Sequence, residues 1–89
     1  MRAVLTVIGR DRVGIIAGVS RVLADCNVNI LDISQTIMQD IFTMIMLVDI
    51  SKINANFSEL SDKLEKKGEE LGVSVRIQHE DIFNSMHRV

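Results

Sequence analysis

Hydrophobic and polar residues recur along this chain in two periods, and each change of period marks a predicted element. Residues 3–8 form a short apolar run that is typical of a β-strand. From Val13 onward the apolar residues recur at helical spacing, which predicts a helix with Asp11 as a candidate N-cap. Arg21 and Asp25 are spaced to form an i,i+4 ion pair on its polar face.

Two further strands follow this helix. The helix is expected to end near Asn27 or Asn29, because asparagine is common at helix ends. Residues 28–38 and 41–50 then predict two strands joined by a tight connection at residues 39–40. That connection lacks the Asn-Gly pair of a two-residue hairpin, so the sequence does not define its geometry.

A second helix is predicted over residues 57–71. Asn56 and Glu59 fit a capping box at its start, and Gly72 suits the position just beyond its end. Gly68 occupies a position on the apolar stripe where a leucine would be expected. The opposite face carries acidic and basic residues and is interpreted as a solvated surface. The apolar stripe consists of Phe57, Leu60, Leu64 and Leu71.

The order of the elements predicts an α+β fold. Residues 73–78 alternate strictly between apolar and polar, as an edge strand with one wet face does. Residues 3–8 and 41–50 are apolar on both faces, which places them at the centre of the sheet. The order βαββαβ with these central strands is the ferredoxin-like sandwich, a four-stranded antiparallel sheet with two helices on one face.

Length and composition limit the functions that this fold can serve. The chain has 89 residues, which fits a single domain over residues 1–89. A domain this small has little room for a deep catalytic cavity, so a shallow cleft or a site shared between subunits is expected. The net charge of −2, with Lys and Arg dispersed, disfavours nucleic-acid binding. The most apolar stretch, residues 41–48, is too short to cross a membrane. A single cysteine, Cys26, cannot form an internal disulfide, which suits a reducing cytoplasm.

The strand predicted over residues 41–50 has more apolar side chains than one helix layer can cover. Apolar residues occupy both of its faces, and a small monomer rarely leaves such a patch in water. Either the tail, residues 80–89, folds back over the patch or a second copy of the chain covers it. We therefore expect a homodimer or a higher homo-oligomer.

The most informative segment joins the first strand to the first helix, at residues 9–15. Gly9 and Gly14 permit close backbone approach or a positive φ, and the start of a helix suits a carboxylate or phosphate. Asp11 can either cap the helix or hold the ammonium group of a zwitterion. The loop matches neither G-x-G-x-x-G nor the P-loop, which disfavours nucleotide binding.

With Asn27-Val28-Asn29-Ile30 opening the next strand, the segment Gly-Arg-Asp-Arg-Val-Gly-Ile resembles the ACT domain family. Over its full length the chain resembles the small stand-alone bacterial ACT proteins of uncharacterised function. The resemblance implies the βαββαβ fold, dimerisation, and an amino-acid effector bound at a subunit interface, between this loop and the start of the second strand of a neighbour. The positions that it implies as ligand-binding are Asp11, Arg12, Val13, Gly14, Ile15, Asn27, Asn29 and Ile30.

The chain departs from this family in two ways. Many members have proline where this chain has Val13, so the loop is less rigid here. In addition, the sequence carries no catalytic or DNA-binding domain. The expected function is therefore a regulatory module, not an enzyme, that acts in trans on an unidentified partner protein. Neither the effector nor the manner of subunit pairing can be predicted from the sequence.

Other functions receive less support. Cys26 lies on an apolar stripe and reads as a buried thiol. His79, Glu80, Asp81 and His87 match no standard metal-ligand spacing, so no metal or other cofactor is expected. Three alternatives remain: an RNA-binding module with this strand order, a small enzyme with a site at a dimer interface, and an interaction module with a vestigial ligand site. The first is weak because Phe42 is the only aromatic residue on a predicted strand.

Overall fold

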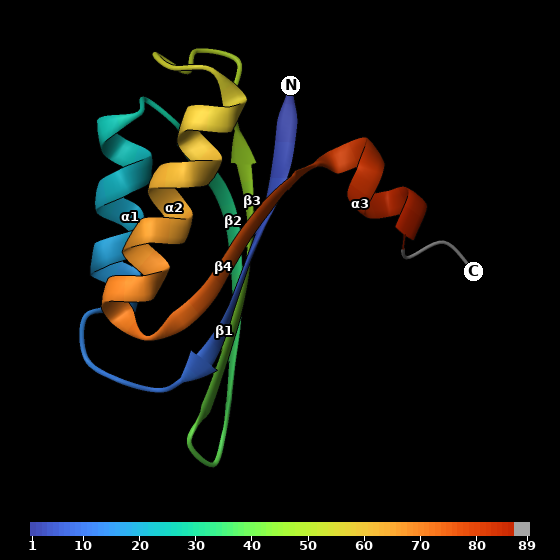
Figure 1. Ribbon diagram of the computed structural model, residues 1–89. Helices are drawn as coiled ribbons and strands as arrows, with labels where there is room; N and C mark the ends of the chain where they lie inside the picture. Colours follow the sequence, from blue (N-terminus) through green and yellow to red (C-terminus); the bar gives the residue numbers. More distant parts are fainter. Residues whose placement is uncertain (87–89) are drawn as a thin grey trace.

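The computed structural model describes residues 1–86 and has the predicted α+β order with one additional helix (Figure 1). Helices α1 and α2 cover one face of a single sheet, and the short helix α3 lies on the other side (Figure 1). Among the described residues, no helix is long and apolar enough to cross a membrane. The elements are β1 (Arg2–Arg10), α1 (Ile15–Asp25), β2 (Asn29–Met38), β3 (Ile41–Asp49), α2 (Phe57–Leu71), β4 (Val73–His79) and α3 (Glu80–Met86).

The sheet has the strand order β2-β3-β1-β4, and all of its neighbouring strands are antiparallel. The two strands predicted to be central, β1 and β3, are therefore central. This confirms the ferredoxin-like arrangement and leaves β2 and β4 as the two edges. Since β1 pairs with β3 from Arg2↔Asp49 to Arg10↔Ile41, the two strands span the full length of the sheet together.

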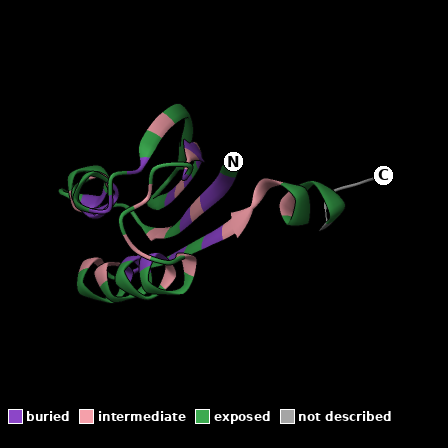
Figure 2. Cartoon of the chain, turned by 90° about the horizontal axis from the view of Figure 1, so that it is seen from above, coloured by how far each residue is buried: buried purple, intermediate pink, exposed green. Residues whose placement is uncertain are grey.

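The core lies between the sheet and the two long helices, where buried residues concentrate (Figure 2). Alternate residues of the central strands point toward the helices and are fully buried, as Leu5, Val7 and Met46 illustrate. The matching side chains of α1 and α2, such as Leu23 and Leu60, are inaccessible to solvent as well. The apolar stripes predicted for both helices therefore form the second half of this core, except for Ile16, which the predicted stripe of α1 included and which is 41% exposed.

Helix α1 begins differently from the prediction. Its N-cap is Gly14, with φ of 95° and no side-chain cap from the described residues, so the prediction of Asp11 as N-cap is wrong. A glycine adopts this left-handed backbone at little cost, and the chain turns into the helix there. The ion pair predicted between Arg21 and Asp25 is confirmed at 3.3 Å. Asn27 follows the C-cap with φ of 61°, which confirms that the helix ends near it.

Helix α2 has the bounds that the sequence predicts, Phe57–Leu71. The side chain of Asn56 accepts a hydrogen bond from the Glu59 backbone N–H at 2.8 Å and donates one to the Glu59 carboxylate at 2.8 Å. This confirms Asn56 as the N-cap, although the Glu59 carboxylate accepts from the Asn56 side-chain amide where a standard capping box uses the backbone N–H. Gly72 ends the helix with φ of 75°. Gly68 is buried on the apolar stripe. A larger residue does not fit there, because a Cβ would lie 2.7 Å from the carbonyl oxygen of Val73.

The surplus of apolar side chains is found where the sequence places it. Ile41 and Ile45 of β3 are exposed on the sheet face away from α1 and α2, together with Ile8 of the neighbouring β1. Helix α3 contacts β1 and β4 but neither β2 nor β3. Within the described residues the tail therefore forms a helix and leaves most of this face uncovered.

Candidate functional site

The β1–α1 loop, residues 11–14, is held at both ends by hydrogen bonds to distant parts of the chain. The backbone N–H of Asp11 donates to the carbonyl oxygen of Asp40 in the β2–β3 turn at 2.8 Å. The Arg12 guanidinium donates to the carbonyl oxygen of Leu71 at the end of α2, at 3.2 Å. Between these anchors Val13 is fully exposed at the tip. The loop is therefore fixed in place although it lacks a proline.

The start of α1 beside this loop is free to receive an anionic group. No side chain among residues 1–86 caps the helix, so its first N–H groups face outward at the positive end of the helix dipole. The exposed carboxylate of Asp11 lies in the same loop and adds a cation-binding group. Ile15 is 2% exposed and packs in the core, so its role is to anchor the helix. This end of the molecule thus offers one acidic side chain and one helix N-terminus.

The second group of predicted site residues lies at the start of β2, where the surface is hollowed. Asn27 and Asn29 line a depression of about 370 Å³ that also receives Asp49 from the end of β3 and Lys52 from the following turn. The Asn27 amide donates to the Lys52 carbonyl oxygen at 2.8 Å and so joins the two walls of the hollow. Ile30 is partly buried against the core and does not line it.

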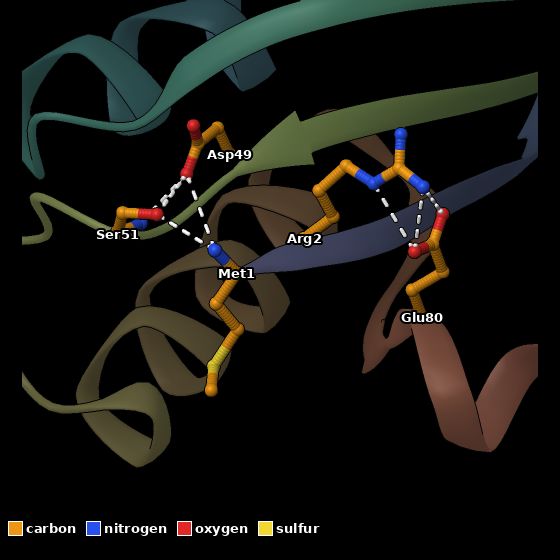
Figure 3. Close-up of polar contacts among 5 residues, drawn as sticks. All are labelled: Met1, Arg2, Asp49, Ser51 and Glu80. Carbon is orange, nitrogen blue, oxygen red and sulfur yellow. Dashed lines mark hydrogen bonds and ion pairs between the residues drawn. The ribbon is translucent and has the colours of Figure 1, made fainter.

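Asp49 is the most strongly bonded side chain of this hollow. Its Oδ1 accepts hydrogen bonds from the Ser51 hydroxyl at 2.6 Å and from the Ser51 backbone N–H at 2.8 Å (Figure 3). These bonds hold the pKa of the Asp49 carboxyl below its ordinary value of 3.8. The amino group of Met1 donates to the Ser51 hydroxyl at 2.7 Å and lies 3.9 Å from Asp49. The carboxylate is therefore a fixed anion at neutral pH.

One chain does not bring the two groups of predicted residues together. Arg10, just before the loop, pairs with Ile41 at one end of β3, whereas Asn29 pairs with Asp49 at the other end. Eight residue steps along a strand correspond to about 26 Å. The loop and the start of β2 thus lie at opposite ends of the same sheet, so a single copy cannot present both to one small ligand.

The remaining sequence candidates have structural contacts. His79 stacks on Phe57 with ring centroids 4.2 Å apart, and Glu80 binds Arg2. Cys26 is fully buried, and His87 lies outside the described residues. Phe42 is buried among core residues, so the strand aromatic on which an RNA-binding interpretation depends is not available for stacking.

Asp49, Ser51 and Lys52 are site residues that the sequence reasoning missed. All three come directly after the apolar run of β3, which the sequence analysis used only to define a strand. Their place in the chain could have identified them, because in an antiparallel sheet the end of β3 lies beside the start of β2. The predicted position of Asn29 therefore already implied that the residue paired with it would share the site.

Comparisons with known proteins agree with this architecture. The family model described as the ACT domain matches residues 2–78. A UPF0237 protein of Methanocaldococcus jannaschii is 64% identical over 88 residues, which cover 99% of this chain and 98% of that protein. The structure of an ACT domain protein from Streptococcus pneumoniae is 41% identical, with a TM-score of 0.81 and 98% of each chain covered. The regulatory subunit of aspartate kinase from Thermus thermophilus is 25% identical, with a TM-score of 0.67, and 86% of this chain matches 50% of that one.

Proposed function

Because this chain belongs to the ACT domain family, we propose that it is a regulatory module that binds an amino acid as a homodimer and acts on a partner protein in trans. The family and its structural neighbours support a ligand-binding regulatory domain. One of those neighbours is a regulatory subunit of aspartate kinase. The main support for a site shared between two copies is that the β1–α1 loop and the start of β2 lie at opposite ends of β3.

Pairing of two β2 edges joins the separated halves. β2 is an edge strand whose outer backbone groups are free to extend the sheet. In an antiparallel, two-fold symmetric pair, the start of β2 in one copy lies beside the end of β2 in the other. That end leads into the turn at Asp40, whose carbonyl oxygen holds Asp11. Each dimer would then contain two equivalent sites.

The charges of the two halves suit a zwitterion. The carboxylates of Asp11 and Asp49 can hold an ammonium group, and Lys52 and the start of α1 can hold a carboxylate. The Asn27 and Asn29 amides supply both donors and acceptors. A small amino acid matches the size of the hollow of about 370 Å³ and both charges.

In this function the ACT domain catalyses no step itself. It passes the response to the amino acid to a partner protein through its surface. The buried thiol of Cys26 has no disulfide partner, which suits the reducing cytoplasm as the place of action. The alternative function is an interaction module whose ligand site is vestigial.

A thermal-shift screen against the common amino acids tests the proposal. A ligand at 100 times its dissociation constant stabilises the fold by about 2.7 kcal/mol, which for a domain of this size raises the unfolding midpoint by about 10 °C or more. Asp11→Ala and Asn29→Ala should each abolish the shift, whereas Lys66→Ala, on the exposed face of α2, should retain it. A screen in which no amino acid shifts the midpoint contradicts the proposal and favours the vestigial alternative.

Mixing the two inactive variants tests whether the site is shared. A mixed dimer of Asp11→Ala and Asn29→Ala chains contains one site with both residues intact and one site with neither. Random exchange makes half of the dimers mixed, so about a quarter of the sites should recover binding in a calorimetric titration. If both halves belonged to one chain, mixing would restore no binding.

A further inference from the structure

The sheet face away from α1 and α2, which we call the open face, is covered at one end only. Along β1 its residues become more exposed from Val4, at 7%, to Ile8, at 48%. The buried end lies beside α3, which contacts β1 and β4. Beyond it, three apolar side chains remain 42–69% exposed on the neighbouring strands; they are Ile45, Ile41 and Met38. Among residues 1–86, nothing therefore covers the far half of the open face.

Helix α3 leaves the sheet in a fixed direction. The Arg2 guanidinium donates to Glu80 Oε1 at 2.9 and 3.1 Å and lies 2.9 Å from Oε2, so both carboxylate oxygens are engaged (Figure 3). The helix projects on the same side as the open face (Figure 1) and exposes 52% of Ile82. Its direction is thus set by a two-point contact to β1, while its apolar surface remains partly in water.

Helix α3 is too short to cover the far half of its own sheet. Seven residues span about 10 Å, whereas the eight residue steps from Arg2 to Arg10 span about 26 Å along β1. The exposed isoleucine of α3 and the exposed isoleucines of the open face therefore cannot meet within one chain.

We propose that α3 packs on the far half of the open face of a second copy, whose own α3 packs reciprocally on the first. The two sheets then face each other with opposite strand directions, which brings the α3 end of each copy over the far end of the other. Charges agree with this pairing through Asp81, because Glu80 is already bound by Arg2. The far end of β1 carries Arg10, whose side chain is 82% exposed and lies 3.8 Å from the exposed Asp40 of its own copy, so Asp81 of the second copy would share this arginine with Asp40. Asp81 is exposed and faces that arginine across the interface.

This surface is separate from the β2 edge, so both can be occupied at once. If the two-fold axes of the β2 and α3 pairings meet at right angles, copies paired through both surfaces form a closed tetramer of about 40 kDa, from chains of 10.0 kDa. If only the α3 surface is used, the particle is a dimer. In either case, loss of the α3 contact halves the particle mass, which light scattering at micromolar concentration measures.

Ile82→Asp is the direct test, and Ile16→Asp is its matched control. Ile16 on α1 is 41% exposed, close to the value for Ile82, but it lies in the helix layer on the other side of the sheet. Ile82→Asp should reduce the mass twofold and Ile16→Asp should leave it unchanged. An unchanged mass for Ile82→Asp, or a wild-type mass of one chain, overturns the proposal. The amino-acid shift of Ile82→Asp is measured alongside, so that this inference and the proposed function fail separately.

Charge reversal tests which groups meet. Asp81→Arg and Arg10→Glu should each halve the mass, because each homomeric pair then places like charges together twice. An equimolar mixture of the two variants should recover the full mass, since a mixed pair contains one native and one reversed contact. Recovery on mixing supports the reciprocal arrangement, and its absence overturns the assignment of Asp81 to Arg10.

Discussion

Arg2, at the start of the first strand, binds both carboxylate oxygens of Glu80, at the start of the last helix. The two residues are 78 positions apart in sequence. The pair therefore joins the N-terminal strand to the segment that follows the family's four-stranded unit. It explains why α3 departs from the sheet in one direction although it makes few other contacts with the domain.

Loss of this pair should loosen α3 without unfolding the domain. Glu80→Gln removes the charge, and since Arg2 is half exposed we expect a loss of less than about 1 kcal/mol in the free energy of unfolding. Hydrogen exchange of the backbone amides of residues 84–86, the ones that can bond within α3, should become faster. Asp25→Asn, which breaks the ion pair on α1, is the control and should leave those amides unchanged. Unaltered exchange in Glu80→Gln would show that the pair does not hold α3.

Ser51→Ala should raise the pKa of Asp49. The Ser51 hydroxyl is the main cause of the lowered pKa, and its backbone N–H is the second. Since the folded-state pKa lies below the unfolded value, the stabilisation from Asp49 is present above about pH 4 and is lost as the pH falls through the lowered pKa. In Ser51→Ala the stabilisation from Asp49 should be smaller and its loss should be complete at a higher pH, and a carboxyl NMR titration should show the raised pKa directly. Ser74→Ala, on β4, should leave the Asp49 titration where it is.

Gly68→Ala should destabilise the fold, although alanine favours a helix by about 1 kcal/mol over glycine. The new Cβ would lie 2.7 Å from the Val73 carbonyl oxygen, and backbone atoms cannot give way cheaply. We expect a net loss of about 1–3 kcal/mol in denaturant unfolding. Gly18→Ala is a matched control, because its Cβ meets the flexible end of Leu71 at 2.9 Å. A Gly68→Ala variant as stable as Gly18→Ala would contradict this account.

Gln39→Gly should stabilise the β2–β3 turn. Gln39 has φ of 59°, a backbone that glycine adopts without the steric cost of a Cβ. We expect a gain of about 0.5–1 kcal/mol, measured as a higher unfolding midpoint. Thr36→Gly, three residues earlier within β2, should have the opposite sign because it weakens a strand. A lower midpoint in Gln39→Gly would contradict the assigned strain.

The elements predicted best are those whose signals are local. Helix α2 has the predicted bounds because Asn56, Glu59 and Gly72 define its ends through contacts within a few residues. The prediction that Asp11 caps α1 is wrong because the helix begins at Gly14, whose left-handed backbone starts it without a side-chain cap. The types of the residues in the loop do not show which of them takes that conformation. Helix α3 was missed since Glu80 is fixed by Arg2, a partner at the far end of the chain.

The candidate site was predicted in part for the same reason. The sequence identified Asn27 and Asn29, but Asp49 and Lys52 reach the same hollow only through the pairing of β2 with β3. Side-chain chemistry at single positions could be read directly. Which positions lie side by side depends on the strand register, and that emerges only from the folded sheet.

The unpaired edge of β2 has a consequence for the behaviour of isolated copies. A bulge between Ile30 and Asp32 disturbs the first part of this edge, and Asp32 adds a charge, which are two devices that oppose unwanted strand addition. The stretch from Ile33 to Met38 has neither a charged residue nor a proline, and it exposes Ile37 by half. Such a stretch is a template on which other chains can grow a β-sheet. Copies that fold but fail to pair through β2 should therefore aggregate. Correct pairing of the β2 edges thus also keeps the protein in solution.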